Sequence, residues 1–368
     1  MKILHTADLH LGKMLNSYSL IDDQEYIIKK IEDIIINENV DTVIVAGDIF
    51  DRAITTQEAL DLFCDFLEFI YKNNKTLIAI LGNHDGNRIT FTNNILKHNN
   101  IYIVNEPKKI KIDNVSFSCI PYHNIHEFRE YYNEDFKTID EAYLYAVSDL
   151  GISSGYYNIM VAHDYFTHNM ERLIESDSEI KNMIGGLEYL DVSMFKEYDY
   201  TALGHMHNAQ KVGLDNIRYS GSILKYSFSE VNHDKSVVII DSVTNTFSLV
   251  PLIPKRDLVD IKGTLNELIN PEFYKNYNYK NDYFRAILPT VEVDAYQALK
   301  SIYPNLMEIK IEDEADDRII ERKIVKEKNY LELFSMFYEE ITKEKITNEE
   351  SLIIKDYLDG GAKWDLIS

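Results

Sequence analysis

The sequence has few of the residues on which secreted and membrane proteins depend. Its 368 residues include only two cysteines, Cys64 and Cys119, which are too few for the disulfide framework of a small secreted domain. Each cysteine lies in an apolar run, so we expect both to pack in the core. The start Met1–His5 leads directly into a predicted strand rather than a cleavable signal, and no apolar run approaches the roughly 18 residues of a membrane span. We therefore expect a soluble, cytoplasmic protein.

Positive charge is also scarce. Lys and Arg number 38 against 61 Asp and Glu, which gives a formal net charge of −23. A stand-alone DNA-binding protein usually carries a basic surface, because phosphate neutralisation supplies much of its affinity. Any nucleic acid that this chain binds must therefore meet a local positive site or be held by a partner. With 45% hydrophobic residues and sparse Pro and Gly, the composition is that of a folded globular protein.

Short β-branched runs alternate with helical patterns in the first part of the chain, which predicts an α/β fold. Helical spacing covers Leu20–Asn37 and Gln57–Asn73. The predicted strands are Lys2–Thr6, Asp41–Ala46, Lys75–Leu81, Val115–Pro121, Tyr157–Ala162, Tyr200–Leu203, Ile217–Ser220, Ser236–Asp241 and Thr246–Pro251.

A domain boundary is predicted at Leu252–Arg256. Residues 1–254 form the first domain, and residues 255–325 form a small α/β unit with strands at Leu258–Thr264, Tyr283–Pro289 and Leu306–Glu312 and helices at Leu265–Ile269 and Ala295–Ile302. Residues 326–368 have a helical pattern, with Phe334, Phe337, Tyr338 and Ile341 on one apolar stripe.

Five short motifs carry the chemistry, and each stands where a predicted strand ends. They are Asp8-Leu9-His10, Gly47–Arg52, Gly82–Asp85, Ala162-His163-Asp164 and Gly204–His207. The carboxyl ends of strands in an α/β sheet form the ligand crevice, so these scattered positions should converge. Their carboxylates, imidazoles and amide suit Mn²⁺, Fe²⁺ or Zn²⁺ better than Mg²⁺, which prefers oxygen alone.

The spacing predicts two metal ions. His205 and His207 could each supply one of two neighbouring ions, and Asp48 is the expected bridge, since a carboxylate can hold two cations about 3.5–4 Å apart. Two divalent ions with few anionic ligands would leave excess positive charge, which attracts phosphate and lowers the pKa of a bound water.

In this order and spacing the five motifs resemble those of the calcineurin-like metallophosphoesterase superfamily. Within it, Met1–Gly12, Gly47–Arg52 and Tyr219–Val238 resemble the SbcD family of bacterial DNA-repair nucleases. The resemblance covers nearly the whole chain and is weakest beyond about residue 255. It implies a two-sheet sandwich flanked by helices, a small α/β capping domain and C-terminal helices.

The resemblance also implies roles for individual residues. One metal would be held by Asp8, His10, Asp48 and His207, and the other by Asp48, Asn83, His163 and His205, with Mn²⁺ the expected ion. His84 would stabilise or protonate the leaving oxygen, and Asp85 would orient it. Archaeal and eukaryotic relatives carry histidine at the position of Asp51, so a catalytic role for that position stays open.

The family implies partners as well: DNA, a second copy of the chain, and SbcC, a coiled-coil ATPase of the SMC type. The chain has no G-x-x-x-x-G-K-[ST] phosphate loop and cannot supply the ATPase itself. The C-terminal helices would dock this partner, although an amphipathic helix more often packs on its own domain. The implied activity is exonuclease action on ends and endonuclease action on hairpins or single strands.

Other interpretations remain open. A small-molecule phosphodiesterase or phosphatase would use the same metals, although Asp85 stands where phosphoprotein phosphatases have Glu and Ala53 where they have Gly. A non-catalytic scaffold is disfavoured because His84 and the ligand positions are intact. His5 is expected in the core or behind the ligands, and the five histidines outside the motifs are expected on loops or the surface (His98, His123, His126, His168 and His233). Lys108–Lys111 could contact DNA or simply form a solvated strand edge.

Overall fold

A computed structural model describes residues 1–86, 96–97, 99–171, 173–180, 190–312 and 347. The chain divides into two units, Met1–Ile311 and Glu312–Ser368. The predicted C-terminal helical segment, residues 326–368, lies outside the described residues apart from Thr347. The first unit contains all five motifs.

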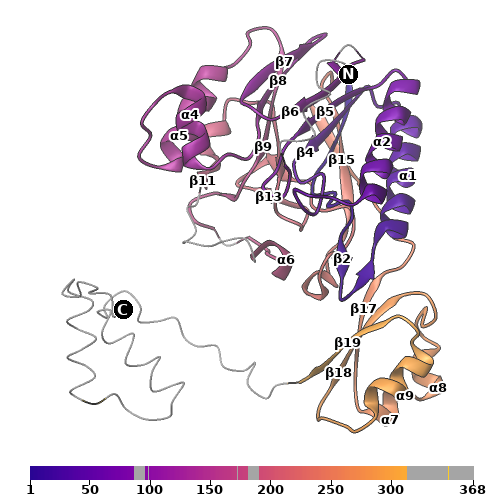
Figure 1. The fold of residues 1–368 in the computed structure, drawn as a ribbon. Helices are drawn as coiled ribbons and strands as arrows, with labels where there is room; N and C mark the ends of the chain where they lie inside the picture. Colours follow the sequence, from indigo (N-terminus) through magenta and orange to yellow (C-terminus); the bar gives the residue numbers. More distant parts are fainter. Residues whose placement is uncertain (87–95, 98, 172, 181–189, 313–346, 348–368) are drawn as a thin grey trace, which may run out of the picture. The chain divides into compact units, whose positions relative to one another are not determined.

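Two six-stranded sheets form the body of this unit (Figure 1). The first has the order β16 (Thr246–Pro251), β15 (Ser236–Asp241), β1 (Lys2–Thr6), β4 (Thr42–Ala46), β5 (Thr76–Ile80) and β6 (Ile101–Val104). The last four run parallel to one another, while β15 and β16 are antiparallel additions at one edge.

The second sheet has the order β13 (Gln210–Val212), β14 (Leu214–Tyr219), β12 (Tyr200–Gly204), β9 (Tyr157–His163), β8 (Val115–Ile120) and β7 (Lys108–Ile112). Its four central strands are parallel, and β13 and β7 pair antiparallel at the edges. Lys108 and Lys111 are exposed on the edge strand β7, where charged side chains discourage pairing with another sheet.

The two sheets face each other across a buried apolar layer. Ile3, Ile44 and Ile78 from the first sheet share one core cluster with side chains of the second, including Phe117 and Ile159. Both faces of the central strands are covered, which explains why β4 and β5 are buried at every position and could be predicted as continuous apolar runs. The predicted two-sheet α/β sandwich is confirmed.

Helices cover the outer faces of the sandwich (Figure 1). The first sheet carries α1 (Ile21–Asn37) and α2 (Gln57–Lys72), and their buried stripes belong to one core cluster with β4 and β5. The second sheet carries α4 (Ile125–Tyr132) and α5 (Ile139–Leu150), which pack in a separate cluster. The α2 N-cap Thr56 accepts a hydrogen bond from the Ala59 amide, as a helix start requires.

The expectation that both cysteines pack in the core is wrong for one of them. Cys119 lies on β8, fully buried between the sheets, whereas Cys64 is exposed on α2. The buried stripe of α2 runs through Ala59, Leu62, Phe63, Phe66 and Ile70, and position 64 falls beside it. An apolar run in sequence does not bury every residue of a helix, because only one stripe faces the sheet.

The predicted small α/β unit is built around a parallel three-stranded sheet, β17 (Leu258–Lys262), β18 (Tyr283–Leu288) and β19 (Leu306–Ile311). Its helices are α7 (Leu265–Leu268), α8 (Pro271–Tyr274) and α9 (Ala295–Ile302). These elements share their own apolar cluster. Arg256 pairs with Asp23 of α1 at 2.6 Å, so an ion pair links this part to the sandwich. Its predicted boundary at residue 254 stays a prediction.

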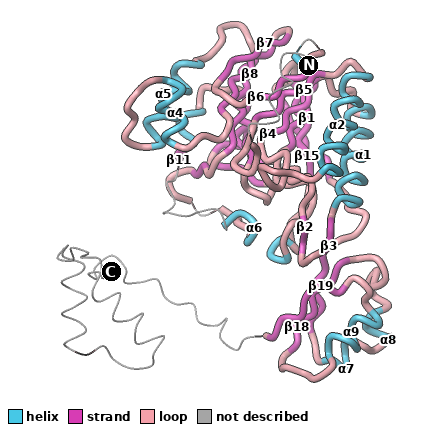
Figure 2. The backbone as a smooth tube through the Cα atoms, in the orientation of Figure 1, coloured by secondary structure: helices cyan, strands magenta, loops and turns pink. Residues whose placement is uncertain are grey.

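The remaining elements are short and lie mostly in loops (Figure 2). They are β2 (Met14–Leu15), β3 (Tyr18–Ser19), β10 (Phe166–Thr167), β11 (Leu190–Asp191), α6 (Asp177–Ile180) and two 3₁₀ turns, η2 (Val192–Phe195) and η3 (Phe228–Glu230). Among the described helices, none has the length and apolar character needed to cross a bilayer.

His5 provides a polar link between the sheets. Its Nδ1 lies 3.1 Å from the hydroxyl of Tyr200 on β12, and its Nε2 lies 3.2 Å from the carbonyl oxygen of Leu203. The carbonyl can only accept, so Nε2 carries the hydrogen, and Nδ1 of the neutral ring can accept from the Tyr200 hydroxyl. Burial lowers the pKa of His5 to about 3. The predicted core position of His5 is confirmed.

Acid should destabilise the fold partly through His5. Its folded pKa of about 3 lies below its ordinary value of 6.5, so the stability it contributes is complete above 6.5 and is lost as pH falls toward 3. The free energy of unfolding, measured by denaturant titration, should fall by up to ~1.4 kcal/mol per pH unit more in wild type than in His5→Gln. The exposed His126→Gln should behave like wild type, and equal slopes in all three proteins would contradict the assignment.

Candidate metal centre

The motif residues meet where the carboxyl ends of β1, β4, β5, β9 and β12 come together. The loop after β1 is tied to the loop after β4, since the amides of Asp8 and His10 donate to the carbonyls of Gly47 and Asp48 at 3.0 Å each. Asp8, His10 and Asp48 adopt positive φ values of 53°, 43° and 51°. Residues other than glycine adopt this region at an energetic cost, and such strain concentrates at functional sites.

Two glycines allow the sheets to approach each other here. A Cβ atom on Gly204 would lie 1.8 Å from the carbonyl oxygen of Ala46, and one on Gly47 would lie 2.1 Å from His163 Nδ1. Any side chain at either position would force β4 and the ends of β9 and β12 apart. The glycines of the second and fifth motifs are therefore required by the close contact between the sheets.

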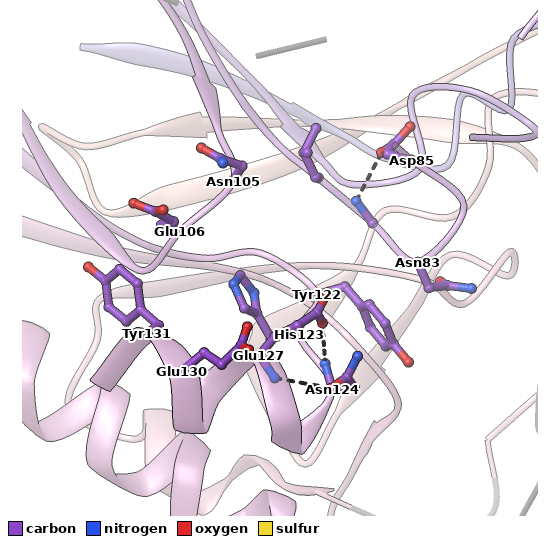
Figure 3. A pocket seen from close by; sticks show the side chains of 12 residues that line it. Asn83, Asp85, Asn105, Glu106, Tyr122, His123, Asn124, Glu127, Glu130 and Tyr131 are labelled. Atoms are coloured by element: carbon purple, nitrogen blue, oxygen red, sulfur yellow. Dashed lines mark hydrogen bonds between the residues drawn. The ribbon is translucent and has the colours of Figure 1, made fainter. Parts of the chain in front are cut away.

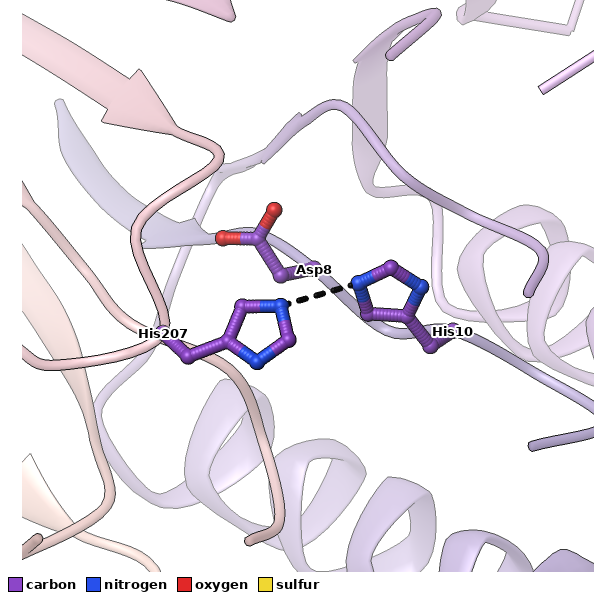
Figure 4. Close-up of side chains that lie close together, drawn as sticks. All are labelled: Asp8, His10 and His207. Atoms are coloured by element: carbon purple, nitrogen blue, oxygen red, sulfur yellow. Dashed lines mark hydrogen bonds between the residues drawn. The ribbon is translucent and has the colours of Figure 1, made fainter. Parts of the chain in front are cut away.

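The first ligand cluster consists of Asp8, His10 and His207 (Figure 4). One ligand atom from each lies within 4.8 Å of the others, and the three side chains are buried. The Nε2 atoms of His10 and His207 face each other at 3.0 Å. Asp8 Oδ2 is buried and has no hydrogen-bond partner among the described residues. A buried, unpaired carboxylate oxygen close to two imidazole nitrogens suits a cation.

The second cluster consists of Asp48, His163 and His205, again within 4.8 Å. Asn83 Oδ1 joins it, at 3.1 Å from His163 Nε2 and 3.2 Å from His205 Nδ1. The other ring nitrogen of His163 lies 2.7 Å from the carbonyl oxygen of Ala46, which fixes the ring. An amide oxygen thus completes a set of two imidazoles and a carboxylate.

Asp48 lies between the two clusters. Its Oδ2 is 3.4 Å from His163 Nε2 in the second cluster and 3.6 Å from His10 Nε2 in the first. Its Oδ1 accepts a hydrogen bond from the His84 amide at 2.9 Å. This is the arrangement expected of a carboxylate that bridges two cations.

The titration behaviour of the buried groups fits a cation site. Burial raises the pKa of Asp8 to about 7. Burial also holds the pKa of His10 well below its ordinary value, so this imidazole is neutral and offers a lone pair. Burial alone would lower the pKa of His163, but Asp48 and Asp8 raise it to about 10. Without a metal, a proton on His163 therefore balances the negative charge of Asp48 and Asp8. A bound metal cation would replace that proton.

His84 lies beside the clusters and is partly exposed. Its Nδ1 is 2.8 Å from the backbone carbonyl oxygen of Asp51, which orients the ring. The Asp85 carboxylate accepts hydrogen bonds from the backbone amides of Ile49, Phe50 and Gly82, at 2.9–3.1 Å. Asp85 therefore fixes the loop that carries His84. The His84 ring contacts the Asp51 carbonyl and lies edge-on to the His10 ring, with centroids 4.8 Å apart.

A groove of about 890 Å³ opens beside His84 and Asn83. Lys13, Arg52 and Arg285 bring positive charge to its wall, which also carries Asp51, Asp177 and Glu308. The Arg52 side chain is 75% exposed, whereas Arg285 is paired with Asp260 at 2.7 Å. A second hollow of about 570 Å³ also reaches Asn83, but Glu106, Glu127 and Glu130 line it (Figure 3). Carboxylates repel phosphate. The first groove sets cations beside its carboxylates, whereas the second hollow has no Lys or Arg among the described residues of its lining, so the first groove is the better path for an anionic substrate.

All the predicted ligands and His84 lie together in this centre. Four polar side chains behind His207 were not predicted from the sequence: Ser178, Glu179, Glu230 and Lys235. Glu230 and Lys235 fall in the stretch Tyr219–Val238 that carries the family resemblance, but no spacing rule marked them as parts of the site.

Comparison with known proteins agrees with this centre. The family model described as calcineurin-like phosphoesterase matches residues 1–209. The D subunit of nuclease SbcCD from Staphylococcus epidermidis is 32% identical over 376 aligned residues, which cover 97% of this chain and 98% of that protein.

Solved structures give weaker likenesses. The protein TT1561 of Thermus thermophilus is 11% identical, with a TM-score of 0.43 over 68% of this chain and 99% of that one. A structure described as a novel archaeal phosphodiesterase is 18% identical, with a TM-score of 0.35 over 68% of this chain and all of that one.

Metal binding should stabilise the protein and should strengthen as pH rises. Mn²⁺ at about 100 times its Kd should add ~2.7 kcal/mol to the free energy of unfolding, and EDTA should remove the gain. Protons held by Asp8 (pKa about 7) and His163 (pKa about 10) compete with the cation, so the gain at fixed Mn²⁺ should be larger near pH 8 than near pH 6.

Thermal denaturation with and without Mn²⁺ measures this gain. Asp48→Asn should lose most of it, because that carboxylate lies within 3.6 Å of an imidazole of each cluster, whereas the exposed Asp215→Asn should keep it. An equal Mn²⁺ effect on both variants would argue against the bridging position of Asp48.

Proposed function

Because this chain belongs to the calcineurin-like phosphoesterase family and, within it, to the SbcD nuclease family, we propose that it cuts DNA as the nuclease subunit of an SbcCD-type complex. It is a phosphodiester hydrolase by this membership. The observation that carries the proposal is the pair of ligand clusters with Asp48 between them, which lie beside His84 on a groove that carries Lys13 and Arg52.

The residues present fit two divalent ions, with Mn²⁺ the proposed pair. Asp8, His10, His207 and Asp48 would hold one, and Asp48, Asn83, His163 and His205 the other. When bound, such ions supply positive charge that offsets the charge of a phosphodiester, and they lower the pKa of an attacking water. The nitrogen and oxygen donors, with no thiolate among them, suit Mn²⁺.

His84 supplies the proton for the leaving oxygen in this proposal. Its Nδ1 donates to the Asp51 carbonyl, so the protonated ring would give up the proton on Nε2. Asp85 keeps this loop in place through three backbone amides. The His84 ring would therefore meet the substrate in a fixed orientation, on which the rate acceleration by a general acid depends.

The acidic composition is compatible with a DNA substrate. Although the chain carries a net charge of −23, Lys13 and Arg52 line the groove next to His84. Asp51 holds the Lys13 ammonium at 2.7 Å, so this charge has a defined place at the groove wall. The remaining affinity for DNA would come from the complex, through a second copy of the chain and an SbcC-type coiled-coil ATPase in the cytoplasm.

Cleavage of labelled hairpin DNA with Mn²⁺ tests the nuclease assignment. His84→Ala should reduce the rate by at least ~100-fold, because it removes the proton donor and leaves the ligands intact. The exposed His126→Ala is the matched control and should cut like wild type. Equal cutting by His84→Ala and wild type would overturn the mechanism.

The same assay separates the alternative function. A small-molecule phosphodiesterase or phosphatase would hydrolyse a chromogenic bis-aryl phosphate briskly and leave hairpin DNA intact, even with the ATPase partner present. A nuclease subunit should cut the DNA, at the latest when that partner is added. Hydrolysis of the small diester alone in both conditions would favour the alternative.

The partner assignment has its own test. Removing residues 326–368 should abolish co-purification with a co-expressed SbcC-type ATPase, because the helical pattern there is the proposed dock. Hydrolysis of the bis-aryl phosphate should persist, since all the ligand residues lie in the unit Met1–Ile311. A truncated chain that still co-purifies would place the dock elsewhere.

A further inference from the structure

His207 is held from behind by a buried acidic group. Glu230 Oε1 lies 3.2 Å from His207 Nδ1, on the side of the ring opposite the first ligand cluster. Ser178 Oγ lies 2.8 Å from the same ring nitrogen and 2.8 Å from Glu230 Oε1. Glu230 is fully buried, which is rare for a glutamate without a strong reason.

A buried lysine balances this glutamate. Lys235 Nζ donates to Glu230 Oε2 at 2.7 Å and to the His207 carbonyl oxygen at 2.8 Å. It also donates to Ser222 Oγ at 2.8 Å. Glu179 accepts a hydrogen bond from the His207 amide. The ring, the amide and the carbonyl of one residue are thus each bound by buried polar groups.

Such a network is costly unless it has a use beyond stability. Replacing a buried ion pair by apolar side chains is often neutral or even stabilising, so burial of Glu230 and Lys235 is weak evidence for a structural purpose. The contacts concentrate on His207 instead. A hydrogen bond from Nδ1 to a carboxylate sets the tautomer of an imidazole and leaves the Nε2 lone pair for a metal.

The contacts of the other predicted imidazole ligands differ. His163 Nδ1 faces a neutral backbone carbonyl, that of Ala46. His10 Nδ1 makes no hydrogen bond among the described residues and lies 3.8 Å from Asp51. His207, by contrast, has the buried Glu230 carboxylate hydrogen-bonded to its Nδ1. Within the cluster of Asp8, His10 and His207, Asp8 supplies the carboxylate.

We propose that Glu230 is a positioning residue for the metal centre: it orients the His207 ring so that Nε2 faces the cation of the first cluster, and its negative charge strengthens that ligand. Lys235 and Ser178 keep the Glu230 carboxylate in place. The inference rests on the proposed metal-dependent function, and it assigns Glu230 a role in metal affinity rather than in contact with substrate.

Calorimetric titration of the metal-free chain with Mn²⁺ tests the proposal. Wild type should bind two ions, and Glu230→Gln should bind one of them about 10- to 100-fold more weakly while the other is unchanged. Asp23→Asn is the matched control, because Asp23 is also buried in an ion pair, with Arg256, but touches no ligand side chain among the described residues. It should keep both wild-type affinities.

A second variant guards against a simple folding defect. Glu230→Gln leaves the Lys235 ammonium buried without its carboxylate, whereas Glu230→Leu with Lys235→Met replaces the whole pair by apolar side chains. Circular dichroism of the metal-free proteins checks the fold. The double variant should fold and show the same weakened site.

If neither variant folds, the position of the proton on the His207 ring of the wild type tests the proposal. In ¹⁵N-histidine spectra of the Zn²⁺-loaded wild type, with His207 assigned by its loss in His207→Asn, the proton should reside on Nδ1; a proton on Nε2 would overturn the proposal. Folded variants with two wild-type Mn²⁺ affinities would also overturn it. Failure of wild type to bind Mn²⁺ would instead count against the proposed function.

Discussion

The buried Asp48 carboxylate is the group on which the rest of the site depends. It lies between imidazoles of both ligand clusters and receives the amide of His84. Asp48 can contact these three groups because hydrogen bonds hold the loops after β1, β4 and β5 together. Gly82 also leaves room for it, since a Cβ atom on residue 82 would lie 2.2 Å from Asp48 Oδ1. The fold thus buries an anion among histidines, which is stable with a proton or a cation to balance it.

This constraint explains how an acidic chain can act on an acidic polymer. Affinity for a reacting phosphate does not require a basic protein when the charge is concentrated in one dry place. The ligand set contains few carboxylates, and Lys13 and Arg52 line the groove beside it. The acidic hollow on the other side of Asn83 would guide an anion away from the wrong path.

The loops at the carboxyl ends of the strands also carry residues that contact the ligands and His84 from behind. Asp85 works through three amides, Asp51 through its carbonyl, and Glu230 through the rear nitrogen of a ligand. None of these groups needs to touch a phosphate. Each would fix the orientation of a loop or side chain of the centre, and such orientation contributes to metal affinity and to catalysis.

The sequence by itself predicted most strands of the two large sheets, the flanking helices α1 and α2 and the positions of the candidate ligands, because these leave short-range patterns: buried apolar runs, helical spacing and polar residues at strand ends. The short edge strands β6 and β13 leave no such pattern and were not predicted. Only the tertiary structure decided what stands behind the ligands. Glu230 meets His207 from 23 residues away, and Asp51 meets His84 from 33 residues away, through contacts that no local period encodes. Cys64 shows the same limit, since which residues of a helix are buried depends on the sheet that covers it.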